Sequence, residues 1–341
     1  MKKYLLPNTL NSYKANLHMH TVVSDGRMTP LETKEAFLKE GYSIVAFTDH
    51  EVMIPHPELI DDNFLAITST EISIDEDKDL YFPFRKVYHL NIYSKDPNKR
   101  IFKGYDSNTI WINHTFDYLK DEEKTITRKR EYTKEFINKI IEEANNDDCF
   151  VSLNHPVWSM QNHDDYSGLK GLWGVEWFNT GCVHSGYYDT IQPLDDLLNE
   201  GEKVFPLATD DAHSLNDCFG GYVVVRANNL KYDEVYEALK NGDFYSSTKP
   251  EIKEISIDNG VVCIKSSKAR QILITTERRY THSKRGTIEN PIEEVYFDIN
   301  NYIKENKEHS NKPMFIRVTV IDFEGNIAYS RPYFMNELEE D

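Results

Sequence analysis

The sequence predicts an α/β protein in which a barrel-like sheet is followed by a small antiparallel β-sandwich. Short apolar runs alternate with amphipathic helical segments through the first two thirds of the chain, and many of those runs finish in His, Asp or Glu. After about residue 250 the helical pattern gives way to short strand-like stretches separated by turns. We therefore expect a barrel domain over residues 1–250 and a β-sandwich domain over residues 251–341.

The barrel is predicted from a repeated strand-then-helix pattern. Residues 30–42 begin with a proline, carry apolar residues at helical spacing and end near Gly41, so we expect a helix there. Buried strands that end in reactive residues are expected at 43–50, 64–71, 149–156, 174–181 and 204–213. Strands that alternate with helices form mostly parallel sheets.

An open doubly wound sheet is the alternative to a barrel. Such a sheet gathers ligands at one or two points where the strand order reverses, whereas the reactive side chains here come from at least six segments. A barrel places the carboxyl ends of all its strands around one face, which suits that distribution. We therefore favour the barrel.

Two later stretches depart from the repeat. Residues 108–146 are highly charged with a long helical pattern, so we expect one or two helices inserted before the next strand. From residue 251 onward, strand-like stretches are joined by turns at Asn259-Gly260 and around Gly325. This pattern predicts the C-terminal β-sandwich.

Composition limits the partners and the location of the protein. The formal net charge of −18 disfavours a polyanion such as nucleic acid as the partner. The four cysteines form no CxxC pair, which favours a reducing compartment. The N-terminal apolar run is broken by Pro7, and no later run approaches the length of a membrane span. We expect a cytoplasmic protein without membrane contact, and the sequence specifies no oligomeric state.

His18 and His20 are the first candidate metal ligands. Residues i and i+2 of a strand face the same side, so both imidazoles could converge on one cation. A His-x-His pair alone is weak evidence, because half-exposed strands carry such pairs by chance. Further candidates stand at or beside the ends of other apolar runs, at His50, Glu71, His89, His155, Asp211 and His213.

The alternative is a set of buried histidines, each hydrogen-bonded in its own pocket. Every such polar group is costly to bury without a partner, and many of them stand at the same end of successive strands. Divalent cations satisfy all of these groups together, so a metal site is favoured. Asp49 and Asp210 stand beside ligand candidates, where they could orient the ligands or cap strand ends.

These motifs resemble those of a known family. The segments "HMHTVVSDG", "TDH", "TEIS", "HP" and "DAH", in this order and at these intervals, resemble the PHP (polymerase and histidinol phosphatase) superfamily of metal-dependent hydrolases. The opening "YKANLHMHTVVSDG", the "YSSTKP" segment and the β-rich tail are most similar to its two-domain, CehA-like branch. The resemblance implies a distorted (βα)7 TIM-like barrel, the PHP fold, with two or three divalent metal ions, which are Zn, Mn or Fe.

Carried over by position, the resemblance implies three ion sites that share ligands. The first ion would take His18, His20, Glu71 and Asp211. The second would share Glu71 as a bridge and add His89 and His155. The third would take Asp25, His50 and His213. The family also uses histidine at the position of Asp25, and "TSTEIS" lacks the glycine often found two residues before the glutamate.

The activity that the resemblance implies is hydrolysis of a small-molecule phosphomonoester or phosphodiester by a metal-activated hydroxide at a di- or trinuclear site. The residues expected to carry the reaction are His18, His20, Glu71, Asp211 and His213. Cations would offset the charge of a phosphate, which reconciles an anionic substrate with an acidic protein. The alternatives are a carboxylic ester, amide or carbamate hydrolase on the same site, a non-enzymatic metal-binding module, and a proofreading nuclease.

Three residues outside the ligand set are candidate substrate contacts. Arg27, close to Asp25, could contact a phosphate or could be a solvated loop arginine. Glu176 and His184 follow a strand that should point into the barrel, so either could touch the substrate or donate a proton. Glu176 could instead anchor its loop.

Two further features could shape a pocket. Trp158, Trp173 and Trp177 could form an apolar wall, although tryptophans commonly serve packing alone. The basic segment 127–130 could form a lid over the site, but a charged helix face is the favoured interpretation.

Overall fold

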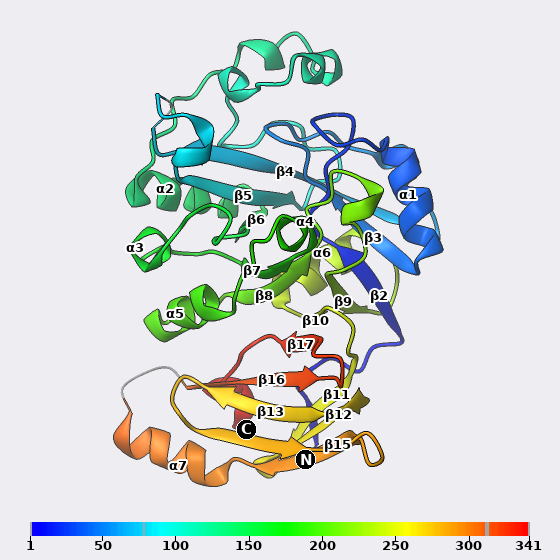
Figure 1. The fold of residues 1–341 in the computed structure, drawn as a ribbon, viewed down its shortest axis with the longest axis vertical. Coiled ribbons are helices and arrows are strands. Elements are labelled where there is room, and N and C mark those ends of the chain that lie inside the picture. The colour runs from blue at the N-terminus through cyan, green and yellow to red at the C-terminus, as the bar shows by residue number, and fades with distance from the viewer. Residues whose placement is uncertain (1, 78, 311–313, 340–341) are drawn as a thin grey trace.

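The computed structural model describes residues 2–77, 79–310 and 314–339, and it is a mixed α/β protein with helices around a large sheet, as predicted (Figure 1). Seven consecutive strands are neighbours in that sheet and carry the candidate ligands at their ends. They are β2 (Asn11–Asn16), β3 (Tyr42–Phe47), β4 (Leu65–Asp75), β5 (Val87–Ser94), β6 (Cys149–Leu153), β7 (Gly174–Asn179) and β8 (Phe205–Thr209). The five strands predicted from the sequence correspond to β3, β4, β6, β7 and β8.

Strand β5 departs from the expected parallel arrangement. Strands β2, β3 and β4 are parallel to one another, and so are β6, β7 and β8, but β5 runs antiparallel to both β4 and β6. The connection from β4 to β5 is the loop 76–86, and among its described residues the one helical element is the 3-10 turn η2 (Phe82–Phe84). A loop without a crossover helix returns the chain in the opposite direction, which explains the antiparallel pairing.

The chain beyond β2 meets the chain beyond β8. The backbone N–H of Asp211 donates to His18 O at 3.0 Å, and the N–H of His20 donates to Ala212 O at 3.0 Å, around a parallel bridge between Met19 and Ala212. The first and last of the seven strands therefore touch at their carboxyl ends. This contact brings the His18-His20 pair against Asp211.

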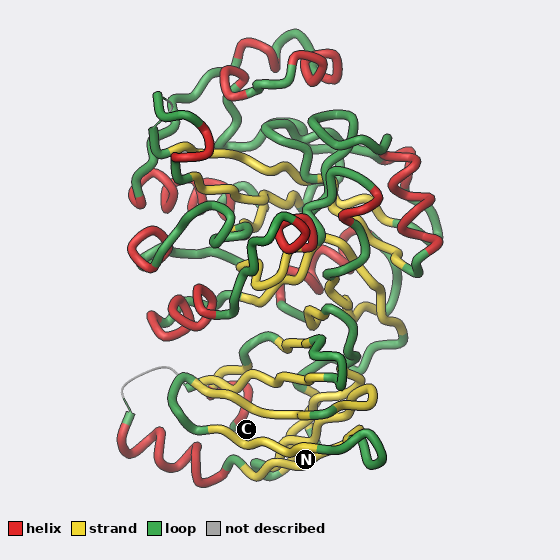
Figure 2. Tube along the Cα trace, viewed as in Figure 1, coloured by secondary structure: helices red, strands yellow, loops and turns green. Residues whose placement is uncertain are grey.

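Helices cover this sheet on its outer side (Figures 1 and 2). The predicted helix at 30–42 is α1, which begins with a capping box between Thr29 and Glu32. The insertion contains 3-10 turns η3 (Ser107–Thr109), η4 (Asn113–Tyr118) and η5 (Glu123–Thr125) before one helix, α2. The helices of this region are α1 (Pro30–Lys39), α2 (Lys134–Asn145), α3 (His163–Tyr166), α4 (Thr180–His184), α5 (Gln192–Glu200) and α6 (Tyr232–Asn241), with further 3-10 turns η1 (Pro57–Leu59) and η6 (Leu215–Asp217). Among the described residues, no helix has the length and apolar character to cross a membrane.

The C-terminal part contains two groups of antiparallel strands around one hydrophobic core, which includes Ile264, Ile272 and Val318. One group is β1 (Lys3–Tyr4), β11 (Ile252–Asp258), β12 (Val261–Ala269) and β15 (Ile292–Asp298). The other is β13 (Gln271–Thr276), β14 (Thr281–Arg285), β16 (Phe315–Ile321), β17 (Ile327–Ser330) and β18 (Tyr333–Phe334). Helices α7 (Asn300–His309) and α8 (Met335–Leu338) complete it.

The C-terminal β-rich part is joined to the rest of the protein by strand pairing in the large sheet and by the N-terminal strand β1. Strand β9 (Tyr222–Ala227) pairs with β2, β10 (Phe244–Ser247) pairs with β9, and β17 pairs with β10, so the large sheet continues into the C-terminal part. The N-terminal strand β1 pairs with β11, so it lies in the same β-rich part as the C-terminal strands (Figure 1). The boundary predicted near residue 250 stays a prediction.

The loop after β2 generates a first prediction. A Cβ added to Gly26 would lie 2.3 Å from the backbone oxygen of His20, which the packing cannot relieve by moving a side chain. We expect Gly26→Ala to lower the free energy of unfolding by about 3 kcal/mol, as measured in urea. The control is Gly41→Ala, which meets nothing within 4 Å but has a φ of +76°, and should cost about 1 kcal/mol. Equal losses in both variants would contradict the close approach at Gly26.

Candidate metal centre

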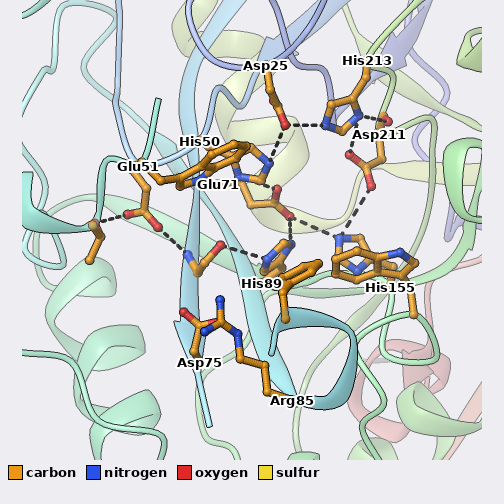
Figure 3. Close-up of a pocket in the computed structure, with 15 residues that line it drawn as sticks. Asp25, His50, Glu51, Glu71, Asp75, Arg85, His89, His155, Asp211 and His213 are labelled. Carbon is orange, nitrogen blue, oxygen red and sulfur yellow. Dashed lines mark hydrogen bonds and ion pairs between the residues drawn. The ribbon is translucent and has the colours of Figure 1, made fainter. Parts of the chain in front are cut away.

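The structure brings all nine ligands expected from the sequence into one largely buried cluster, on segments that belong to or follow six of the seven strands; β7 carries none of them. Within each of three groups the nitrogen and oxygen atoms that could hold a metal lie within 4.8 Å of one another. These groups are His18, His20, Glu71 and Asp211; Glu71, His89 and His155; and His20, Asp25, His50 and His213. A fourth group within the same limit is His18, His155 and Glu176. Figure 3 shows seven of these side chains converging on one cavity. The third group includes His20 in addition to the residues expected for that ion.

Glu71 is the centre of the cluster. Its side chain is buried, and its two oxygens face five histidines at 3.2–3.4 Å. Oε1 faces His18, His89 and His155, and Oε2 faces His20 and His50. A carboxylate that presents one oxygen to each of two groups of imidazoles has the geometry of a bridging ligand.

The histidines and carboxylates of the cluster lie in contact and shift one another's pKa values. Burial acts to lower the pKa of His20, but Asp211 and Glu71 outweigh it and raise that pKa to about 10. Burial likewise acts on His155, and the same two carboxylates raise its pKa to about 9. The pKa of His50 falls to about 3, because burial and the neighbouring His20 both disfavour its charged form. Burial opposes ionisation of Glu71 and Asp211, yet the histidines around them hold both pKa values below the ordinary range.

Several buried atoms of this cluster have no hydrogen-bond partner among the described residues. They are Nδ1 of His20, Nδ1 of His50 and Oδ1 of Asp211. The last two have close contacts, to Glu71 Oε2 at 3.2 Å and to His20 Nε2 at 3.0 Å, but neither contact has hydrogen-bond geometry. A buried polar atom without a partner costs about 1–3 kcal/mol, and all three atom types are good donors to a divalent cation. The chemistry of the site therefore fits bound cations.

The backbone is strained at the same place. His155, Asp211 and Glu51 have φ values of +28°, +49° and +67°, although none of them is glycine. All three line the cavity. Strain of this kind persists only where the surrounding structure holds it, and it concentrates at functional sites.

Glu176 lies behind the ligand histidines. Its carboxylate accepts hydrogen bonds from His18 Nδ1 at 2.7 Å, the backbone N–H of His155 at 3.0 Å and the hydroxyl of Thr209 at 2.6 Å. Asn179 Nδ2 also donates to it at 3.0 Å. Because four donors already occupy this carboxylate, it suits the orientation of a ligand better than direct coordination of a metal. Its bond to Nδ1 of His18 turns Nε2 of the same ring toward Glu71. The geometry favours an anchoring role for Glu176.

Asp49 and Asp210 anchor loops beside the cluster. Asp49 Oδ1 accepts the backbone N–H of Thr21 at 2.7 Å and of Ser24 at 3.2 Å, which fixes the loop that carries Asp25. Asp210 accepts the hydroxyl of Thr180 and the backbone N–H groups of residues 219–221 at 2.6–3.1 Å. Burial raises the pKa of Asp210 to about 6 against these bonds. Both aspartates thus hold the positions of ligand-bearing loops.

All three predicted substrate contacts lie outside the cavity lining: Glu176 is buried behind the ligand histidines, and the other two are Arg27 and His184. Arg27 is exposed, and its backbone N–H donates to His213 O at 2.8 Å. His184 is half exposed at the end of α4, with Nδ1 3.6 Å from Asp217 Oδ1. Neither is among the described residues that line the cavity, and their roles stay predictions.

The three tryptophans divide between the cavity and the core. Trp158 lines the cavity, whereas Trp173 and Trp177 are buried and donate to Leu239 O and Ser246 Oγ at 2.8 and 2.9 Å. The basic segment 127–130 was expected on a charged helix face, but it is not helical. The side chain of Arg130 in this segment is buried. Its Nη1 lies 2.7 Å from Glu51 Oε2, which ties the insertion to the cavity.

The cavity itself has a volume of about 520 Å³ and includes residues that the sequence did not single out. They are Glu51, Ser73, Asp75, Phe82, Arg85, Thr109 and Trp111. These residues lie in loops and in the insertion, or along β4. No motif or strand-end position marks them, so only the fold brings them to the site.

Comparison with solved structures finds several that align with much of this chain at low sequence identity. No family model and no curated protein matches the chain. A two-domain protein from Bacteroides vulgatus ATCC 8482 containing a predicted PHP-like metal-dependent phosphoesterase is 14% identical, with a TM-score of 0.46, over 97% of this chain and 98% of that one. An amidohydrolase from Chromobacterium violaceum is 12% identical, with a TM-score of 0.39, over 67% and 96%. The lesion-specific endonuclease EndoQ from Pyrococcus furiosus is 14% identical, with a TM-score of 0.39, over 82% and 65%.

The histidine pKa values predict that cation binding releases protons. With pKa values of about 10 and about 9, His20 and His155 are protonated at about pH 7.5 in the cation-free protein, whereas coordination requires neutral imidazole. Burial acts to lower the pKa of His18, but Asp211, Glu71 and Glu176 outweigh it and hold that pKa well above its ordinary value. We therefore expect roughly three protons to be released per chain, one from each of these histidines, and the apparent affinity for Mn²⁺ to rise with pH. Calorimetry in buffers of different ionisation enthalpy measures this number. Binding without proton release would contradict the electrostatic description.

Glu176 gives a prediction about metal affinity. Glu176→Gln keeps the size of the side chain but weakens its hold on His18 Nδ1. We expect the affinity for Mn²⁺ or Zn²⁺ to fall about 10- to 100-fold, as measured by competition with a chelator. Glu202→Gln, an exchange in a partly exposed pair with Lys170, is the matched control and should leave the affinity unchanged. An unchanged affinity in Glu176→Gln would show that His18 needs no such orientation.

Proposed function

We propose that this chain is a metal-dependent phosphoesterase of the PHP superfamily, acting on a small-molecule phosphomonoester or phosphodiester. One observation carries the proposal: three groups of candidate ligands share Glu71 or His20, so that cations bound there would be neighbours. Neighbouring cations are the arrangement that activates water and offsets the charge of a phosphate. The sequence motifs that resemble the family lie at these same residues.

The protein side chains hold and orient this chemistry. Glu71 would bridge two ions, and His18, His20 and Asp211 would complete the first. Asp25 and His213 are partly exposed, at 26% and 38%, and lie 3.3 Å apart at the cavity. They are therefore the members of the set best placed to meet an incoming substrate.

The proposal extends to the number of ions, the fold of each part of the chain and the location of the protein. We assign two or three ions, which are Zn, Mn or Fe. The candidate ligands form several overlapping groups, and each group offers three or four ligand atoms close together. The bridge between Met19 and Ala212 supports closure of a distorted (βα)7 barrel in residues 1–250, and the shared core of the C-terminal strands supports a β-sandwich in residues 251–341. The four cysteines are free, which supports a cytoplasmic location.

The charge of the chain supports a small substrate. A net charge of −18 repels a long polyanion, whereas a single phosphate needs only the local field of the cations. The cavity of about 520 Å³ also has the size of a small-molecule site. Hydrolysis of a carboxylic ester, amide or carbamate on the same centre is the alternative.

A substrate screen tests the proposal. With added Mn²⁺ or Zn²⁺ we expect turnover of p-nitrophenyl phosphate or bis-p-nitrophenyl phosphate exceeding that of p-nitrophenyl acetate. His20→Ala and Asp211→Ala should lower this turnover by at least about 100-fold and lower the metal content in elemental analysis. His163→Ala, an exposed histidine in α3, is the control and should change neither quantity.

Two outcomes would contradict the proposal. Turnover of the acetate alone would replace the phosphoesterase with a carboxylic ester hydrolase. Full metal content in both His20→Ala and Asp211→Ala would show that the cluster is not the metal site.

A further inference from the structure

The cavity extends beyond the candidate metal ligands into an arm lined by aromatic side chains. We call this region the aromatic arm and define it by Phe82, Arg85, Trp111 and Trp158. Phe82 and Arg85 come from the loop between β4 and β5, Trp158 follows the ligand His155, and Trp111 comes from the insertion. None of these residues has a role in the proposed metal chemistry.

Trp158 connects the metal centre to the arm. Its ring centroid lies 5.1 Å from that of His155, 5.4 Å from that of His89 and 6.0 Å from that of Phe82. One continuous wall of rings therefore leads from the ligand histidines to Phe82. A planar group attached to a phosphate at the ions could stack along this wall.

Trp111 forms the other side of the mouth. Its ring lies 6.0 Å from that of His50, and its side chain is 64% exposed. The insertion that carries it is held in place by bonds from Thr109 and Arg130 to Glu51, at 2.8 and 2.7 Å. Phe82 is also 48% exposed. Exposed aromatic rings on a rigidly held cavity rim are typical of ligand-binding surfaces rather than of a packed core.

Arg85 places a fixed positive charge in the arm. Its Nε lies 3.0 Å from Asp75 Oδ1, and its guanidinium carbon lies 5.3 Å from the centroid of the Phe82 ring. Figure 3 shows Asp75 and Arg85 on the side of His89 that faces away from Asp25 and His213. Among the described residues that line the cavity, Arg85 is the single lysine or arginine, against five carboxylates.

We propose that the aromatic arm binds the non-reacting part of the substrate, and that this part is a planar unsaturated ring carrying an anionic group. The ring stacks against Trp158 and Phe82, and the anion pairs with Arg85. Because Asp75 and Phe82 already hold the guanidinium, little conformational entropy is lost when it binds an anion. This inference rests on the proposed function, since it takes the reacting phosphate to lie at the ions.

The proposal is tested by the binding of phosphonates, which are not hydrolysed. Calorimetry of the Mn²⁺-loaded protein compares methylphosphonate, phenylphosphonate and 4-phosphonobenzoate. We expect phenylphosphonate to bind about tenfold tighter than methylphosphonate, because the ring stacks on Trp158. We expect 4-phosphonobenzoate to bind about tenfold tighter again, because its carboxylate reaches Arg85.

Variants assign each gain to a residue. Trp158→Leu should remove the gain from the ring, and Arg85→Gln should remove only the gain from the carboxylate, while Arg85→Lys restores part of it. Arg279→Gln, an exposed arginine of the C-terminal part, is the matched control and should leave all three affinities unchanged. A carboxylate gain that persists in Arg85→Gln would overturn the role of Arg85.

The wild-type protein alone decides the inference if a variant fails to fold. Equal affinities for the three phosphonates, together with turnover of a phosphoester, would overturn the aromatic arm and leave the proposed function standing. If no phosphonate binds and no phosphoester is turned over, both fail together. The stepwise gains in the wild-type protein would support the arm whichever phosphoester is the best substrate.

Discussion

The structure depends on the burial of one carboxylate among five imidazoles. Glu71 is 1% exposed, and burying a charge is tolerated only where it is paired and hydrogen-bonded. The five histidines around it come from four segments: one segment after β2, the chain after β3, strand β5, and the chain after β6. The requirement to satisfy Glu71 therefore fixes how these four segments lie relative to one another. The strained φ values of His155 and Asp211 show how far the backbone departs from regular geometry to meet that requirement.

A second layer of carboxylates holds the first in place. Glu176, Asp49 and Asp210 are all buried, and each accepts several hydrogen bonds from backbone or side-chain donors of the ligand-bearing segments. None of these bonds requires a cation, so the ligands are held near their positions by the fold itself. Binding to a site prepared in this way loses less conformational entropy than binding to a loose set of side chains.

Residues at strand ends were predictable from the sequence, and residues in loops were not. The pairs His18-x-His20 and Asp211-x-His213 each follow an apolar run. The apolar run predicts a buried strand, and the two-residue spacing predicts that both members of a pair face the same side. Arg85 and Trp111 follow no such run, and their contribution to the cavity depends on how one loop and one insertion fold back. Strand β5 was not among the strands expected from the sequence, and its antiparallel direction depends in the same way on how the loop before it returns the chain.

The cavity joins two opposite electrostatic environments, and this explains how an acidic protein could select an anionic ester. At one end, carboxylates and imidazoles offer ligands that favour cations, and cations there would reverse the local potential. At the other end, the guanidinium of Arg85 is paired with Asp75 and oriented by the Phe82 ring, so an anion could bind it without any cation. An anion bound at only one end would face the carboxylates that line the remainder of the cavity. A ligand with a negative group at each end and a planar apolar middle satisfies both ends, so selectivity arises from the spacing of the two positive centres rather than from net charge.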